Sequence, residues 1–96
     1  MAKSAIDMFT KCMATELGPK GIRVNSVNDD PIAPYPWDPN NTPNDPFVEL
    51  APKIPVKRVA VSDDLAFAVL LLAAPESTFI TGTNMLVDGG YTVAGL

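Results

Sequence analysis

The stretch from Phe79 to Gly90, FITGTNMLVDGG, decides the fold that we expect for this chain. Its centre, Met85 to Val87, is a short apolar run that predicts a β-strand. Gly82 precedes this strand and the pair Gly89-Gly90 follows it. Glycines at both ends are typical of a strand that is entered and left through tight turns. The stretch therefore predicts a short final strand.

The run from Lys20 to Asn28, KGIRVNSVN, predicts a second strand over residues 22–27, because β-branched residues recur in it. A helix is predicted before it, over residues 3–17, and Gly18-Pro19 is a typical helix stop. The helix has one apolar stripe at helical spacing, and a second apolar line beside it, so we expect burial on more than one side. The stripe consists of Ile6, Phe9, Met13 and Leu17.

A second helix is predicted to begin at Ser62, which is a good N-cap residue. Asp63 and Asp64 add negative charge at the positive end of its dipole. The order is then helix, strand, proline-rich connection over 31–57, helix and strand. Two short parallel strands cannot be covered on both faces by this chain alone. We therefore expect an α/β fold, part of a larger doubly wound parallel sheet.

Composition narrows the function classes. The 96 residues allow one small domain, and the formal charge of −4 gives no electrostatic footprint for nucleic acid. No apolar run approaches the length of a membrane span. Cys12 is the single cysteine, so an internal disulfide is excluded and a reducing, cytoplasmic location is expected. The chain has no histidine, which excludes a Ser-His-Asp triad or a histidine-ligated zinc site within it, and no metal site is expected.

Together, the segments 79–90 and 20–28 resemble the C-terminal portion of the short-chain dehydrogenase/reductase family, and the resemblance covers residues 1–30 and 58–91. The resemblance implies a Rossmann-type domain that uses NAD or NADP to transfer hydride to or from a small carbonyl or alcohol substrate. It also implies a homo-oligomer. The glycine-rich cofactor motif and the catalytic serine of the family have no counterpart in these 96 residues, and Ser26 belongs instead to the strand signature.

The residues Met1 to Ala5 resemble the end of the family's Tyr-x-x-x-Lys motif, and Lys3 matches its lysine. In the family this lysine holds the cofactor ribose and lowers the pKa of the tyrosine, since a cation favours the phenolate. The tyrosine would precede Met1 by two places, so we expect the isolated chain to be inactive. A solvated lysine in a first helical turn is the alternative.

Ile32 matches the residue whose main chain holds the nicotinamide carboxamide. Here Asp29 and Asp30 replace the usual Pro-Gly, and Pro34 replaces a threonine. The two carboxylates would oppose cofactor binding if they faced its phosphates, and would matter little if they faced solvent. A solvated turn is the simplest interpretation of the pair. Acid–base chemistry or metal binding are the alternatives.

The proline-rich segment 31–57 aligns with the family's substrate loop, and its aromatics are Tyr35, Trp37 and Phe47. They could close over an apolar substrate, or they could fasten the loop to the domain. A PxxP pattern at 31–34 leaves partner binding open. As an alternative to the enzyme, the chain could be a non-catalytic remnant that acts through oligomeric contacts of its apolar helices.

Overall fold

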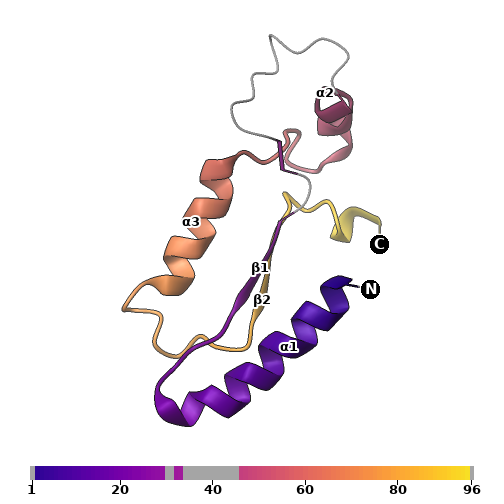
Figure 1. Ribbon diagram of the computed structural model, residues 1–96. Helices are drawn as coiled ribbons and strands as arrows, with labels where there is room; N and C mark the ends of the chain where they lie inside the picture. Colours follow the sequence, from indigo (N-terminus) through magenta and orange to yellow (C-terminus); the bar gives the residue numbers. More distant parts are fainter. Residues whose placement is uncertain (1, 30–31, 34–45, 96) are drawn as a thin grey trace. The chain divides into compact units, whose positions relative to one another are not determined.

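The computed structural model describes residues 2–29, 32, 33 and 46–95 (Figure 1). Its elements follow the predicted order, which confirms the α/β class. They are α1 (Ala2–Leu17), η1 (Gly18–Lys20), β1 (Ser26–Asp29), α2 (Pro46–Leu50), η3 (Ala51–Lys53), α3 (Ser62–Ala73), β2 (Asn84–Val87) and η4 (Val93–Gly95), where η marks a 3-10 helix.

The chain falls into two compact units. Unit 1 comprises Met1–Asn28 and Ala68–Leu86, and unit 2 comprises Asp29–Phe67 and Val87–Leu96. No helix in the described part of the chain is long and apolar enough to cross a membrane.

Strands β1 and β2 pair in parallel. The Gly82 N–H donates to the Val24 carbonyl at 2.8 Å, and the Ser26 N–H donates to the Thr83 carbonyl at 3.0 Å. Both partners advance along the sequence together, as they must in a parallel pair. The Ser26 hydroxyl donates to Asn84 Oδ1 at 2.6 Å. Ser26 therefore ties the two strands together, which confirms its structural interpretation.

Strand β1 begins at Ser26, four residues later than predicted. The Val24 N–H donates to the Thr81 side-chain oxygen at 3.1 Å and not to a backbone carbonyl. Gly82, opposite this point, has a φ of 77°, so β2 is not yet extended there. Regular pairing of the backbone hydrogen bonds between β1 and β2 therefore begins only after Val24 and Gly82.

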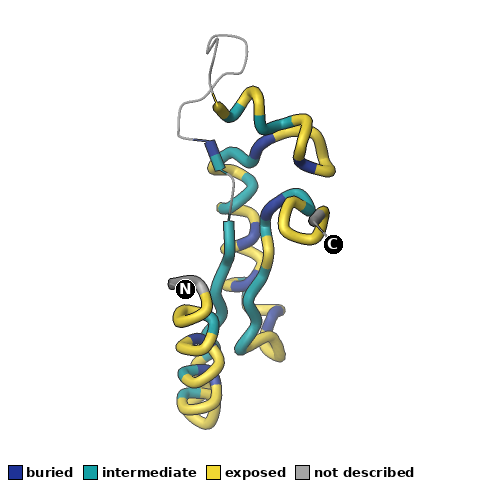
Figure 2. The backbone as a smooth tube through the Cα atoms, turned by 90° about the vertical axis from the view of Figure 1, so that its right-hand side faces the viewer, coloured by how far each residue is buried: buried dark blue, intermediate teal, exposed yellow. Residues whose placement is uncertain are grey.

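The apolar stripe of α1 is only partly buried, since Met13 and Leu17 are partly buried and the two residues nearer the start of the helix are exposed. Ile6 and Phe9 are 52% and 63% exposed, whereas the buried positions of the helix are Thr10 and Ala14 (Figure 2). Ala14 lies against the entry to β2, because a Cβ placed on Gly82 would come within 3.4 Å of the Ala14 Cβ. The fully buried positions of α1 are therefore occupied by small side chains, whereas Ile6 and Phe9 are largely exposed.

Arg23 joins the entry of β1 to the end of α3. Its Nη1 donates to the Leu72 carbonyl at 2.7 Å and to the Ile80 carbonyl at 3.1 Å, and its Nη2 lies 3.4 Å from the Ala74 carbonyl. The last carbonyls of a helix have no partner within the helix and carry its negative dipole end. A guanidinium supplies both the donors and the positive charge that this end requires.

Unit 2 has its own small core of Ala33, Ile54 and Val59, against which Phe47 and Leu50 pack. Of the three loop aromatics, Phe47 therefore fastens its segment to the domain. Tyr35, Trp37 and the PxxP pattern lie outside the described residues.

A turn at Asp88 closes unit 2. The Asp88 carboxylate accepts hydrogen bonds from the N–H groups of Gly90 at 3.0 Å and Thr92 at 3.1 Å. Hydrogen bonding from Thr92 lowers the pKa of Asp88 against the opposing effect of burial. The aspartate thus holds the glycine pair in its turn, as expected for a structural signature.

Asp64, not Ser62, caps α3 in the described hydrogen bonds. Asp64 Oδ2 accepts from the Val61 N–H at 2.9 Å, and the carboxylate pairs with Arg58 at 2.8 and 2.9 Å. The hydrogen bond from Arg58 is the main cause that lowers the pKa of Asp64 from 3.8 to about 2. A carboxylate in the first helical turn also suits the helix dipole.

We expect acid to remove the contribution of Asp64 to stability. Because its pKa is lower in the folded chain, the contribution is complete above about pH 4 and is lost as the pH falls towards about 2. Arg58 is largely exposed, so the loss should stay below about 1 kcal/mol. Urea unfolding at pH 5 and at pH 2.5 would measure it. The free energy of unfolding should change less between these pH values for Asp64→Asn than for the unmodified chain. An equal change in both would contradict the assignment of the acid effect to Asp64.

Candidate cofactor site

Ile32 follows the carboxyl end of β1 by three residues. In open α/β sheets, ligands bind beyond the carboxyl ends of the strands. Ile32 forms a parallel bridge with Ala60, in which the Ala33 N–H donates to the Ala60 carbonyl at 2.8 Å. Ala60 immediately precedes the start of α3, so this bridge fixes the backbone at position 32 within unit 2.

In the register of this bridge, the N–H and C=O groups of Ile32 do not form hydrogen bonds with Ala60. In extended backbone, the N–H and C=O of one residue point to one side and those of the next residue point to the other. Since the Ala33 N–H faces Ala60, the N–H and C=O of Ile32 face the opposite side. A main-chain donor and acceptor at the end of a strand match the amide donor and carbonyl acceptor of a carboxamide.

Lys3 lies in the first turn of α1, and the structure describes its backbone alone. Position 3 precedes Thr10 by seven residues, two helical turns, and thus falls on the same face of the helix. Thr10 is buried, and its hydroxyl donates to the Ile6 carbonyl at 2.8 Å. Lys3 belongs to unit 1 and Ile32 to unit 2, so each is placed within its own unit only.

Asp29 is the last residue of β1 and is partly buried, whereas Asp30 lies outside the described residues. Over residues 2–29, 32, 33 and 46–95, no three acidic or cysteine side chains gather where they could hold a metal ion. Asp29 therefore belongs to no such cluster in this part of the chain.

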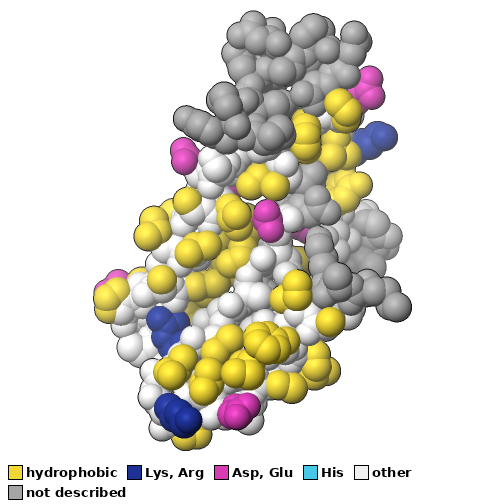
Figure 3. Space-filling model, in the orientation of Figure 1, with side chains coloured by type: hydrophobic (Ala, Val, Ile, Leu, Met, Phe, Trp, Pro, Cys, Tyr) yellow, Lys and Arg dark blue, Asp and Glu magenta, His cyan; other side chains and the backbone are white. Residues whose placement is uncertain are grey.

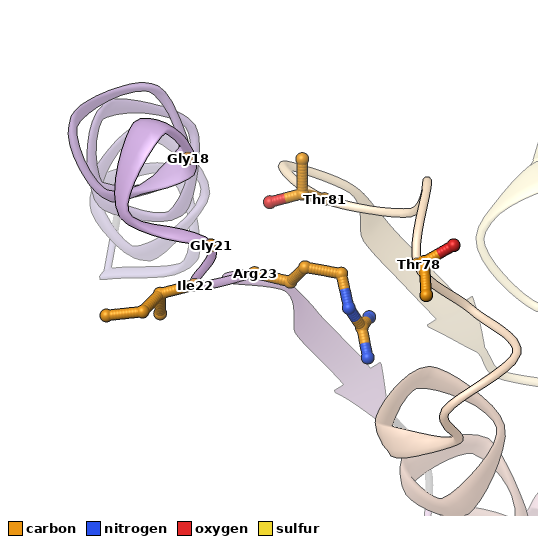
Figure 4. A pocket seen from close by; sticks show the side chains of 6 residues that line it. All are labelled: Gly18, Gly21, Ile22, Arg23, Thr78 and Thr81. Atoms are coloured by element: carbon orange, nitrogen blue, oxygen red, sulfur yellow. The ribbon is translucent and has the colours of Figure 1, made fainter.

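A cavity of ≈ 220 Å³ lies in unit 1, before the start of β1 (Figure 4). Figure 4 shows Arg23 extending away from the strand, and its guanidinium is occupied by the carbonyls at the end of α3. The cavity opens at the amino ends of the strands, opposite to the end where such sheets bind ligands. We therefore exclude it as the cofactor site. Its lining consists of Gly18, Gly21, Ile22, Arg23, Thr78 and Thr81.

Sequence reasoning placed Asp64 at the positive end of the α3 dipole, but it missed the pairing of Asp64 with Arg58 and the role of Arg23. With α3 starting at Ser62, Asp64 lies three places after Val61 and accepts from its N–H, which is one half of a capping box. Arg23 had no local signal, because its carbonyl partners lie about fifty residues away along the chain.

Comparison with known proteins gives one consistent result. A family model described as enoyl-(acyl carrier protein) reductase matches residues 1–92. L-xylulose reductase of Caenorhabditis elegans is 37% identical over 91 residues, covering 95% of this chain and 36% of that protein. D-erythrulose reductase of Gallus gallus is 37% identical over 92 residues, covering 96% and 37%. The chain thus spans about a third of the length of these curated relatives.

Solved structures agree with the sequence relatives. A short-chain type dehydrogenase/reductase from Mycobacterium marinum is 39% identical, with a TM-score of 0.77 over 94% of this chain and 34% of that one. A structure of an ElxO variant with NADPH bound is 27% identical, with a TM-score of 0.81 over 95% of this chain and 37% of that one. The arrangement of helices and parallel strands described above is therefore the one found in these structures.

Proposed function

Because this chain belongs to the short-chain dehydrogenase/reductase family, we propose that it is the C-terminal portion of an NAD(P)-dependent oxidoreductase domain. The substrate class is a small molecule with a carbonyl or alcohol group, as the names of the reductases among its relatives suggest. When bound, the nicotinamide supplies or accepts the hydride. The observation that carries the proposal is the main chain of Ile32, three residues after β1 in sequence, whose N–H and C=O point away from Ala60 in their bridge.

In this proposal the residues of the chain bind and orient. The N–H and C=O of Ile32 fix the carboxamide, which limits how the nicotinamide ring can turn. Lys3 donates hydrogen bonds to the ribose hydroxyls and supplies a positive charge, which favours an ionised tyrosine nearby. Both tyrosines of these 96 residues, Tyr35 and Tyr91, follow Lys3 in sequence, so neither of them occupies the family position of the proton-transferring group.

We expect the isolated chain to bind nicotinamide weakly and to turn nothing over. Titration with NADH and NADPH, followed by nicotinamide fluorescence, measures binding, and absorbance at the nicotinamide band with a panel of small ketones measures turnover. Lys3→Met should weaken binding by roughly tenfold, since a charged hydrogen bond to ribose is lost. Lys11→Met is the matched control, because Lys11 is an exposed lysine of the same helix.

Turnover of a ketone by the purified chain would contradict the expectation that it is inactive. If Lys3→Met and Lys11→Met weaken nicotinamide binding equally, the proposed role of Lys3 is wrong. If nicotinamide does not bind and the chain self-associates tightly, the second candidate function is favoured. That candidate is a non-catalytic remnant that acts through assembly, and the observation in its favour is the exposed apolar side of α1, including Ile6 and Phe9.

A further inference from the structure

The first half of α1 buries polar side chains and exposes apolar ones. Asp7 is only partly exposed, whereas its neighbours Ile6 and Met8 are exposed. Thr10, three residues further along, is buried. Hydrophobic side chains gather along α1 on the surface that Figure 3 shows. An acidic side chain that is less exposed than its apolar neighbours is unusual, because burial of a charge is costly unless the charge is paired.

The carboxylate of Asp7 has an oxygen without a hydrogen-bond partner. Its Oδ1 is buried, and in the part of the chain that the structure describes no donor lies within hydrogen-bond distance of it. The Thr10 hydroxyl does not supply one, because it donates to the Ile6 carbonyl at 2.8 Å. Buried carboxylate oxygens almost always accept a hydrogen bond in folded proteins. The Asp7 oxygen therefore needs a donor from the buried side of the helix.

Two lysines are each one helical turn from Asp7, Lys3 before it and Lys11 after it. At about 100° per residue, position 3 falls within about 20° of the buried Thr10, whereas position 11 is about 100° away from Thr10. Lys11 is exposed. Position 3 therefore shares the buried face of the helix with Asp7, and Lys11 does not belong to that face.

Position 3 is also placed towards the carboxyl ends of the strands. Ala14 lies against Gly82, at the entry to β2. From there α1 runs back along the strands towards its own start (Figure 1). The helix rises about 16 Å from Ala14 back to Lys3, and a strand of four residues spans about 13 Å. Lys3 is thus near the end of the sheet where ligands bind, and Asp7 lies one turn behind it.

We propose that Asp7 is a positioning residue for Lys3, whose ammonium donates a hydrogen bond to Asp7 Oδ1. An ammonium has three N–H donors. Two of them match the two hydroxyls of a cofactor ribose, and the third is left for Asp7. This bond orders a long side chain before the cofactor arrives, which lowers the entropic cost of binding. The consequence for binding rests on the proposed function, whereas the contact between the two side chains is measured without cofactor.

NMR spectroscopy of the lysine ammonium groups tests the contact. In the unmodified chain, the Lys3 ammonium hydrogens should exchange with water at least about threefold more slowly than those of Lys11. Lys3→Met removes the Lys3 signal and so assigns it. Asp7→Asn keeps the shape of the side chain, removes its charge and should abolish the difference. Glu16→Gln, which changes an exposed acid of the same helix, is the matched control and should leave the Lys3 signal unchanged.

Titration of the same variants with NADH tests the positioning role. Asp7→Asn should weaken binding by roughly threefold in the unmodified chain and should have no effect in the Lys3→Met background, because the lysine that it positions is then absent. An equal effect in both backgrounds would overturn the positioning role. Equal exchange of the Lys3 and Lys11 ammonium groups in the unmodified chain would overturn the contact itself. Slow exchange at Lys3 without any NADH binding would support the contact and contradict the proposed function instead.

Discussion

Replacing Gly89 with alanine is expected to disrupt unit 2. Gly89 has a φ of 61°, a left-handed conformation that costs an L-residue about 1–2 kcal/mol. The added Cβ would also lie 2.6 Å from Val56 Cγ2 and 2.9 Å from Ile54 Cγ2. Ile54 is a member of the unit 2 core and is 1% exposed, so it has little room to yield. Overpacking of this kind adds about 1–3 kcal/mol, for a total of about 2–5 kcal/mol.

Urea unfolding of Gly89→Ala against the unmodified chain measures this loss. Gly18→Ala is the matched control, because no atom lies within 4 Å of the Cβ that it would add. Val56→Ala in the Gly89→Ala background removes the closest contact and should restore part of the lost stability. If Gly18→Ala destabilises the chain as much as Gly89→Ala, the steric explanation is wrong.

The order of elements was predictable because its signals are local. Glycines at both ends of the Met85–Val87 run, and Gly18-Pro19 after the first helix, mark boundaries that depend only on neighbouring residues. The observed bounds of β2 and α1 agree with these boundaries to within one residue. The start of β1 was not predictable in this way, since it depends on the Thr81 side chain, far along the sequence.

Burial was predicted less well than secondary structure. The predicted stripe has the helical spacing of a buried face, yet Ile6 and Phe9 within it are exposed, because burial depends on what lies opposite a helix. The small residues Thr10 and Ala14 are buried instead, and Ala14 lies against Gly82 at the entry to β2. A sequence pattern indicates that one side of a helix is apolar, and it does not indicate which residues pack against that side.

The candidate site shows the same limit. Lys3 and Ile32 were assigned by resemblance, and no local property of either residue distinguishes it from its neighbours. What makes Ile32 suitable is the side to which its main chain points, and that is set by its pairing with Ala60. Pairing between residues almost thirty positions apart cannot be obtained from periodicity, and the role of Ile32 stays a prediction.

Removing the guanidinium of Arg23 is expected to loosen the end of α3 from the strands. Arg23→Met keeps the length of the side chain and leaves the carbonyls of Leu72 and Ile80 without their donor. Both bonds involve a charged donor, and such bonds contribute about 1.5–3 kcal/mol each. Because the two bonds share one side chain, we expect a combined loss of about 3 kcal/mol in the free energy of unfolding.

The planar geometry of the Arg23 guanidinium should contribute to stability as well as its charge. Arg23→Lys keeps the charge, but an ammonium cannot reproduce the planar arrangement of donors that reaches several carbonyls at once. We therefore expect Arg23→Lys to recover less than half of the stability that Arg23→Met loses, as measured by urea unfolding. Lys20→Met is the matched control, since Lys20 is an exposed cation only three residues away in η1. Full recovery with lysine would mean that charge at the negative end of the α3 dipole, and not the fork of hydrogen bonds, holds this helix in place.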